Sequence, residues 1–479
     1  MTSNLTTNAA PPPLDEASVE RSPWWRRAPV LSALGAIVAF TLVVLTRSPS
    51  LLEPDDFAYR ASIVALSKGE ILLSNAHYLA LKASLSTSEG PGIMQWHHLH
   101  SGSWISEKNP GYPFVAVVFY ALGLLRLTPL FFGAIACLSL FVAMRRWVGE
   151  RAGALAVWLY CFSGAALTFA WRATMPSFTD ASLVATGMAL LVWTLLATER
   201  TSRRRRWVGL AAFVALELAV VVRYTNVLEL VVAAVTVVLL ARRTALGLRT
   251  LAVWGASVLV TGAVVLGFDE WAYGSATSTG YSGGEISFSL GSGWANLKGM
   301  PTQLAAAMPL WLLAGAALVV LLVRHLRRRS TSARVGVDDA RIGAILGAGW
   351  LSLWGLYLCY TWTASQLYDG PAGHTITVHV IRFYLPALGL LAMLGAWLLA
   401  CAPRWLGVLI TSLLIVAALF SFNAMASTSS GSASGGPVGP GAQGPGISGR
   451  PVHGSSAGGP GGAVQGPSAR PTKGAPPAP

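Results

Sequence analysis

The sequence has little charge. Only 11% of its 479 residues are Asp, Glu, Lys or Arg, whereas a soluble domain carries roughly 25%. Hydrophobic residues make up 53% of the chain, and the mean hydropathy is +0.56. This balance excludes a soluble globular protein and predicts an all-α polytopic membrane protein.

Cysteine and lysine are also scarce. The four cysteines, Cys137, Cys161, Cys359 and Cys401, lie in apolar runs without CxxC spacing, so neither a disulfide framework nor a cysteine metal site is supported. Arginine supplies most of the 34 basic residues, which is typical of a GC-rich bacterial gene. The basic residues gather in short clusters between apolar runs, which indicates membrane topology and no nucleic-acid partner.

About eleven apolar segments are long enough to cross a hydrocarbon core roughly 30 Å thick as helices. A further run at 111–125 is short and opens with Gly111, Tyr112 and Pro113. If it is a juxtamembrane helix and not a span, every strong arginine cluster falls on the side of the N-terminus, as the positive-inside rule requires. The predicted spans lie near residues 28–46, 128–144, 152–170, 181–197, 207–222, 225–241, 250–267, 304–323, 342–361, 381–401 and 405–422.

This topology divides the chain into three parts. Residues 1–27 form a cytoplasmic segment, 28–422 the membrane domain and 423–479 an extracytoplasmic tail. The first extracytoplasmic loop, 47–127, is large and contains the juxtamembrane helix. No small-residue cleavage site follows the first apolar run, which predicts a retained anchor. The tail is nearly all Gly, Pro, Ser and Ala, so it buries too little apolar surface to offset its ordering entropy and is expected to be disordered.

Acidic residues follow the first span directly, in Asp55-Asp56-Phe57-Ala58-Tyr59. A carboxylate at a membrane surface can act as a general base, because partial desolvation raises its basicity. The same residues are equally typical of a helix N-terminus, where acids complement the helix dipole. Both interpretations can hold together.

The far end of the first loop carries histidines and a lysine. His97, His98 and His100 could ligate a divalent metal, although adjacent histidines seldom fit one tetrahedral site and no fourth ligand is obvious. Lys108 precedes Pro110-Gly111 at the membrane surface. It is suited either to a phosphate or to lipid head groups.

Isolated arginines mark three later outer positions. Arg172 and Asp180 flank the second outer loop, where Asp180 also suits the first turn of a helix. Arg223 lies in a tight turn, with Glu217 and Glu229 six residues away on either side, as a structural pair or an anion site. Arg382 opens a late span from outside, against both the positive-inside bias and the helix dipole, which favours a phosphate ligand.

Taken together, these segments resemble the membrane-embedded glycosyltransferase C superfamily, in particular protein O-mannosyltransferases of glycosyltransferase family 39 and the aminoarabinose transferase of lipid A. The resemblance covers about residues 28–420 and lies in motifs of matching order. These motifs are Asp55 to Tyr59, Lys108-Asn109-Pro110-Gly111-Tyr112-Pro113, Arg172 to Asp180, Arg223-Tyr224-Thr225 and Arg382-Phe383-Tyr384-Leu385-Pro386.

The resemblance implies an inverting transferase on the outer face of a bacterial cytoplasmic membrane. It would move a hexose or pentose, as a mannosyltransferase does, from a polyprenyl-phosphate carrier to an envelope glycan, lipid or protein. It implies Asp55 as general base, with Asp56 and Asp180 as further catalytic candidates. The candidates for holding the donor and its phosphate are Tyr59, Lys108, Arg172, Arg223, Arg382 and Tyr384.

Two features depart from the family pattern. Ser177-Phe178-Thr179 intervene between Pro176 and Asp180, and the third outer loop, around Tyr281 and Gly283-Gly284-Glu285, matches no family motif and is expected to shape the acceptor site. The competing interpretation is a transporter or lipid flippase that uses Glu217, Arg223 and Glu229 as a relay. Against it, the spans show no inverted repeat, and transporters place their substrate groups at mid-membrane.

Overall fold

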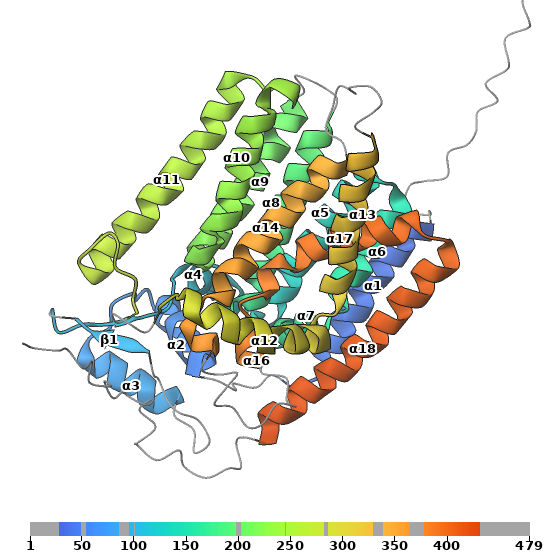
Figure 1. The fold of residues 1–479 in the computed structure, drawn as a ribbon. Coiled ribbons are helices and arrows are strands. Elements are labelled where there is room, and N and C mark those ends of the chain that lie inside the picture. Colours follow the sequence, from blue (N-terminus) through green and yellow to red (C-terminus); the bar gives the residue numbers. More distant parts are fainter. Residues whose placement is uncertain are drawn as a thin grey trace, which may run out of the picture. The chain divides into compact units, whose positions relative to one another are not determined.

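The structure, a computed structural model, describes residues 28–48, 54–85, 95–99, 101–197, 203–244, 246–281, 286–328, 339–364 and 378–431. All of these belong to one of the two compact units into which the chain divides, residues 1–434. The described part of this unit consists of helices, the turns that connect them and one two-stranded hairpin (Figure 1). The predicted N-terminal segment 1–27 and most of the predicted tail, 432–479, lie outside the described residues.

Long apolar helices build the unit. They are α1 (Ala28–Leu45), α5 (Thr128–Trp147), α8 (Ser177–Leu196), α9 (Arg203–Val222), α10 (Val227–Thr244), α11 (Leu248–Tyr273), α13 (Leu310–Arg328), α14 (Asp339–Leu358) and α18 (Arg404–Gly431). Shorter helices complete the apolar set: α6 (Glu150–Cys161), α7 (Gly164–Trp171) and α17 (Leu388–Cys401). Every segment predicted to span the membrane is therefore helical, and the all-α membrane fold is confirmed.

The number of spans differs from the prediction. Eight helices in the described part of the chain are long and apolar enough to cross a membrane, or nine if the bent pair α6 and α7 is one span. Two predicted spans are not among them: α9 begins with four arginines and contains Glu217, and α17 is only 14 residues long. The count of eleven stays a prediction.

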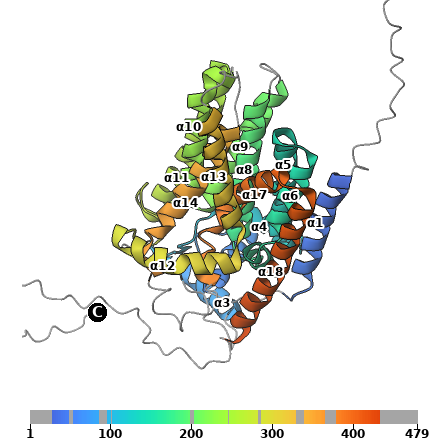
Figure 2. The same cartoon turned by 45° about the vertical axis from the view of Figure 1, so that its right-hand side comes forward.

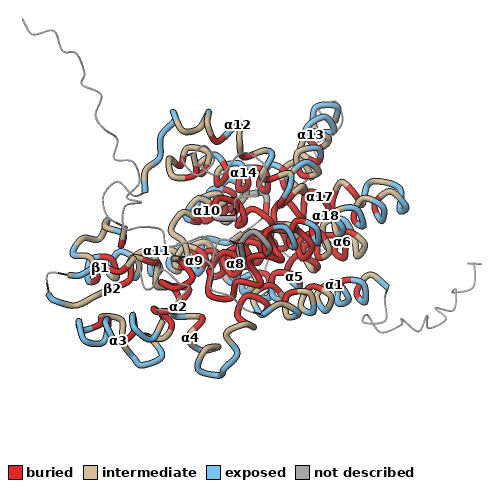
Figure 3. The backbone as a smooth tube through the Cα atoms, turned by 90° about the horizontal axis from the view of Figure 1, so that it is seen from below, coloured by how far each residue is buried: buried red, intermediate tan, exposed pale blue. Residues whose placement is uncertain are grey.

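Helix α8 forms the centre of the core. Almost all of its side chains are buried, and α5, α9 and α17 pack around it (Figure 3). Small residues allow this close packing: a Cβ atom at Gly389 of α17 would lie 2.3 Å from the Cβ of Ala185 on α8. By contrast, α11 is exposed along nearly all its length and touches the bundle mainly through α9.

Helices α6 and α7 form one apolar segment bent by 60°. Ser163 ends the continuous helix by capping α7, because its Oγ accepts a hydrogen bond from the Ala166 amide (3.0 Å). Gly164 then lets α18 approach, since a Cβ there would lie 2.4 Å from the Ser421 Oγ. Helix α18 itself continues to Gly431, so the tail predicted to begin at 423 is helical for its first nine residues.

The predicted large first loop is folded. It contains α2 (Pro54–Ser67), α3 (Asn75–Leu85), an antiparallel pair of strands β1 (Trp96–His98) and β2 (Trp104–Ser106), and α4 (Gly111–Ala121). Tyr78 of α3 stacks on Trp104 of β2 with ring centroids 4.0 Å apart. Helix α4 has only 11 residues, too few to cross a membrane, which agrees with the predicted juxtamembrane helix.

Helix α12 (Leu290–Ala307) contains Pro301 within its length. It lies across the direction of α13 and α18 (Figure 2). The remaining short helices are η2 (Leu125–Leu127), η3 (Tyr224–Asn226), α16 (Val378–Ile381) and η4 (Leu385–Ala387). The turns at η3 and η4 hold Arg223 and Arg382 at the same end of the bundle as α2.

Candidate active site

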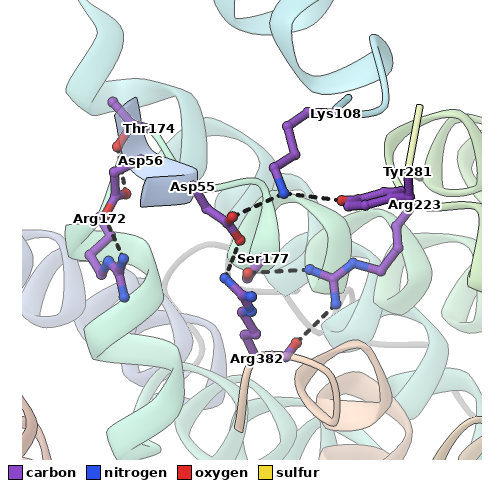
Figure 4. Close-up of polar contacts among 9 residues, drawn as sticks. All are labelled: Asp55, Asp56, Lys108, Arg172, Thr174, Ser177, Arg223, Tyr281 and Arg382. Atoms are coloured by element: carbon purple, nitrogen blue, oxygen red, sulfur yellow. Dashed lines mark hydrogen bonds and ion pairs between the residues drawn. The ribbon is translucent and has the colours of Figure 1, made fainter. Parts of the chain in front are cut away.

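Helix α2 positions the two adjacent acids. It begins at Pro54, so Asp55 and Asp56 occupy its first turn, as the sequence predicts. Successive helical residues point in directions roughly 100° apart, so the two carboxylates face different surroundings. Figure 4 shows Asp55 between Lys108 and Arg382, whereas Asp56 points toward Arg172 and Thr174.

Asp56 is buried and forms part of the packing between helices. Its carboxylate forms an ion pair with Arg172, which is 1% exposed, and accepts a hydrogen bond from the Thr174 hydroxyl (2.8 Å). A buried ion pair of this kind joins α2 to the turn between α7 and α8. Breaking it by removing one partner would leave a buried charge uncompensated.

Lys108 reaches Asp55 from the turn before α4. Its Nζ lies 2.9 Å from Asp55 Oδ1 and donates a hydrogen bond to the Tyr281 hydroxyl (3.2 Å). Two close backbone approaches fix this arrangement. A Cβ at Gly111 would lie 2.5 Å from the Val221 carbonyl, and a Cβ at Gly280 would lie 2.5 Å from the Glu107 Cα.

Two arginines complete the group of cations. Arg382 donates to Asp55 Oδ2, and the Arg223 Nη1 donates to the main-chain oxygen of Arg382 (3.1 Å). The Phe383 ring lies 4.8 Å from the Arg382 guanidinium and 5.5 Å from that of Arg223. Because the electron-rich face of an aromatic ring attracts cations, Phe383 stabilises two like charges close together.

Asp180 holds Arg223 from the side of the core. Its Oδ2 lies 3.1 Å from the Arg223 Nε, and Asn226 donates to its other oxygen. Asn226 also donates to the Ala219 carbonyl (3.0 Å), which ties the turn to α9. Asp180 is fully buried, so it sets the position of Arg223 without facing the cavity.

These groups surround a cavity of about 880 Å³, within the range of ligand sites in proteins. Its lining comes from α2, the turn before α4, the turns at 175–176 and 222–225, and the segments 279–281, 286–288, 357–362 and 382–383. All of these segments lie at or beside the loops assigned to the outer face by the charge pattern. Asp55, Tyr59, Lys108, Arg223 and Arg382 line the cavity.

Electrostatics keep Asp55 ionised. Burial alone raises the pKa of its carboxyl, but the charges of Arg382 and Lys108 outweigh burial and hold that pKa well below its usual value. Burial raises the pKa of the Tyr59 and Tyr281 phenols, so both are neutral donors at physiological pH. An anion that entered the cavity would therefore meet three cations and neutral hydroxyls beside the carboxylates of Asp55 and Glu107.

Two of the three histidines proposed as metal ligands lie in the described part of the chain. His97 and His98 alternate on β1, where His97 Nε2 contacts the Gly280 carbonyl and His98 packs against Trp104. His100 lies outside the described residues. Among the residues that are described, no three His, Cys, Asp or Glu side chains come together in a way that would hold a metal ion.

Comparison by sequence finds no matching family model and no matching curated protein. Comparison by structure finds ArnT from Cupriavidus metallidurans, bound to undecaprenyl phosphate, with a TM-score of 0.50 and 17% identity over 81% of this chain. The chain covers 63% of ArnT, less than two thirds of its length. The archaeal oligosaccharyltransferase AglB from Archaeoglobus fulgidus, in complex with an inhibitory peptide and a dolichol-phosphate, gives a TM-score of 0.48 and 10% identity over 85% of this chain and 56% of AglB.

The chain shares the fold of ArnT. The predicted resemblance is confirmed at the level of the fold. Within this fold, the residues of the predicted motifs converge from segments that are far apart in sequence. The roles of the individual residues follow only from the geometry described above.

Four predicted site residues lie outside the cavity lining. Asp56 and Arg172 pair with each other, Asp180 lies behind Arg223, and Tyr384 is buried against Trp354 with its ring centroid 5.5 Å away. Helix rotation and packing, which the motif does not encode, turn these four side chains away from the cavity, and their roles in the reaction stay predictions.

Some lining residues were not predicted as site residues. Tyr281 contacts the Lys108 ammonium through both its hydroxyl and its ring, and Glu107 lines the cavity beside Lys108. Tyr281 stands in a loop without a family motif. The glycine at 280 is the feature of the sequence that could have indicated this contact, because glycine permits the close approach of two backbones.

Proposed function

We propose that this chain is an inverting membrane glycosyltransferase that moves a sugar from a polyprenyl-phosphate carrier to an envelope glycan, lipid or protein. The observation that carries the proposal is the Asp55 carboxylate held between Lys108 and Arg382 in an 880 Å³ cavity of a glycosyltransferase C fold. The arrangement combines a base with a group of cations suited to a phosphate.

In the proposed reaction, an acceptor hydroxyl attacks the anomeric carbon of the donor sugar. The new carbon–oxygen bond forms as the bond between that carbon and the phosphate oxygen breaks. Asp55 accepts the proton of the hydroxyl, and the polyprenyl phosphate leaves with the bonding electron pair. Lys108, Arg223 and Arg382 stabilise the charge that develops on the phosphate. A single displacement inverts the anomeric centre.

Donor binding would also change Asp55. Without a ligand, two cations make Asp55 a weak base, because they hold its pKa below the usual value. A lipid phosphate that binds Lys108 and Arg382 would compete with Asp55 for both. Its negative charge would raise the pKa of Asp55 and so activate the base when the donor is in place.

The segments that line the cavity support an outward-facing site in a bacterial cytoplasmic membrane. Arginine contacts cluster at the other end of the bundle: Arg146 and Arg204 lie over Trp193, and Arg324 lies over Trp397. The positive-inside rule assigns that end, and with it the N-terminus, to the cytoplasm. Membrane lipids then surround the bundle, and a lipid-linked donor approaches within the membrane.

The geometry does not favour the transporter alternative. Glu217 accepts hydrogen bonds from the Ser257 and Thr261 hydroxyls (2.8 and 3.1 Å) and thereby joins α9 to α11. Glu229 is buried in α10 and lies outside the cavity lining. Of the three proposed relay residues only Arg223 lines the cavity.

Asp55→Asn tests the base directly. The purified protein in lipid nanodiscs is incubated with radiolabelled undecaprenyl-phosphate mannose, glucose or arabinose and envelope extract. We expect transfer to fall about 100- to 10,000-fold, the usual contribution of a general base. Undecaprenyl phosphate should bind at least as tightly as to the wild type, because the variant lacks the negative charge that competes for Lys108 and Arg382.

Glu270→Gln is the matched control, because Glu270 is an exposed acid outside the cavity lining. It should retain full transfer. Full transfer by Asp55→Asn would contradict the assigned base, and wild-type protein that transfers no sugar from any of the three donors would contradict the enzyme.

A further inference from the structure

The described residues on one side of the cavity include an aromatic wall that the proposed chemistry does not use. It consists of Phe288, Tyr360, Trp362 and Phe383, all of which line the cavity. Neighbouring rings are in contact: the centroids of Phe288 and Tyr360 are 5.2 Å apart, those of Tyr360 and Trp362 6.1 Å, and those of Trp362 and Phe383 5.8 Å. Three separate segments of the chain contribute these rings.

Main-chain hydrogen bonds between two segments hold Phe288 beside Tyr360. Phe288 and Tyr360 form an antiparallel bridge. The Ser289 amide donates to the Cys359 carbonyl (2.7 Å), and the Thr361 amide donates to the Ser287 carbonyl (3.0 Å). The rings are therefore fixed relative to each other before a ligand binds, which lowers the entropy cost of binding.

Phe288 is the exposed apolar part of the wall, whereas Tyr360 is only 8% exposed. Phe288 is 41% exposed although it lines the cavity, and Ile286 beside it is exposed to the same extent. Contact with water makes such a surface favourable to cover. A sugar ring suits it, because one face of the ring is formed by C–H groups while the hydroxyls point outward to polar partners.

We propose that the aromatic wall stacks on the sugar of the lipid-linked donor and provides specificity for it. The inference depends on the proposed function, in which Lys108, Arg223 and Arg382 hold the phosphate. The Arg382 guanidinium lies 5.6 Å from the Trp362 ring centroid and 4.8 Å from that of Phe383. A sugar esterified to a phosphate at Arg382 therefore lies next to the wall, and Phe288 is the exposed part of the wall that it can cover.

Phe288→Leu separates sugar recognition from phosphate binding. Affinities of the full chain in nanodiscs are measured for undecaprenyl phosphate and for its mannosyl, glucosyl and arabinosyl esters. The variant should bind undecaprenyl phosphate as the wild type does. Its affinity for the preferred sugar ester should fall about three- to tenfold, the effect expected for one aromatic contact.

Three matched variants define the outcome. Phe288→Tyr keeps the ring and should keep wild-type affinity, and Trp294→Leu removes a 64% exposed aromatic residue outside the lining and should change neither affinity. Trp362→Leu should weaken both ligands, because Trp362 also packs on Arg382.

The inference is overturned if Phe288→Leu leaves the affinity for every sugar ester unchanged, or if it weakens undecaprenyl phosphate by the same factor. Wild-type protein that binds none of these lipids would overturn the proposed function and the inference together. Wild-type protein that binds the lipids without transferring sugar would contradict only the proposed reaction.

Discussion

At the scale of the residue, the decisive feature is one carboxylate with two cations. Asp55 and Asp56 are neighbours of identical chemistry, yet Asp55 faces Lys108 and Arg382 in the cavity while Asp56 is buried against Arg172. The sequence shows that an acid follows the first span. Which of the two acids meets the cavity depends on the rotation of α2, which packing sets.

The shifted pKa of Asp55 predicts the pH dependence of catalysis. Its pKa in the folded protein is depressed, so Asp55 stays ionised as the pH falls through the ordinary aspartate value of about 3.9. The acid limb of kcat/KM, which reports the free enzyme, should therefore show no Asp55 titration between about pH 5 and 8. Because the pKa of Asp55 is lower in the folded than in the unfolded protein, its ionisation stabilises the fold above the ordinary aspartate pKa. This stabilisation is lost as the pH falls below that value.

Lys108→Met provides the comparison for this profile. Loss of one cation should raise the pKa of Asp55 and move the acid limb to higher pH, besides weakening donor binding. Steady-state kinetics from pH 4 to 9 at constant ionic strength measures the profiles of the wild type and of Lys108→Met. An acid limb at the same pH in both proteins would show that Asp55 does not control it.

At the scale of the element, the entry to α4 determines where Lys108 lies. Gly111 begins α4 against the end of α9, where its Cα approaches the Val221 carbonyl too closely for any side chain. Proline and glycine before α4 are visible in the sequence and predict a turn. The contact with Val221 is not visible there, because it joins residues 110 positions apart.

Gly111→Ala should displace α4 and with it Lys108. The added methyl would lie 2.5 Å from backbone atoms that cannot move cheaply, and overpacking of this kind costs about 1–3 kcal/mol. We expect a lower unfolding temperature in nanodiscs and weaker binding of undecaprenyl phosphate. Gly35→Ala on α1, where nothing lies within 4 Å, is the control and should leave both unchanged. Unaltered stability and binding in Gly111→Ala would contradict the assigned contact.

At the scale of the whole molecule, charge decides orientation. The cavity and its three cations lie at one end of the bundle, and the arginines that contact Trp193 and Trp397 lie at the other. The predicted orientation places the N-terminus in the cytoplasm and the cavity outside. The isolated cations of the cavity oppose this bias, which fits their proposed role as phosphate ligands.

Cysteine labelling of intact cells tests the orientation. In a cysteine-free background, Ser101→Cys in the first loop should react with a membrane-impermeant maleimide, because it lies outside. Arg327→Cys at the end of α13 should react only after permeabilisation. Both positions are exposed, so the difference reports sidedness and not burial. The reverse pattern would place the cavity in the cytoplasm and contradict an outer-face transferase.

The amino-acid sequence alone predicts the helical membrane architecture, the short helix at 111–121 and the order of the motifs. These follow from apolar length, charge placement and turn residues, which are local properties of the chain. It also indicated Asp55, Lys108, Arg223 and Arg382, because ionisable residues beside apolar runs are costly and therefore informative. Apolar length alone does not fix the number of spans, because α9 carries more charge and α17 is shorter than expected of a span.

How these residues meet depends on the packing of the folded chain. It turned Asp55 into the cavity and Asp56 away, placed Asp180 behind Arg223, and brought Tyr281 to Lys108. It also joined Phe288 to Tyr360 in one aromatic wall. The physical reason is that hydrophobic periodicity fixes which elements form, whereas the rotation of each helix and the contacts between distant loops depend on packing across the whole bundle.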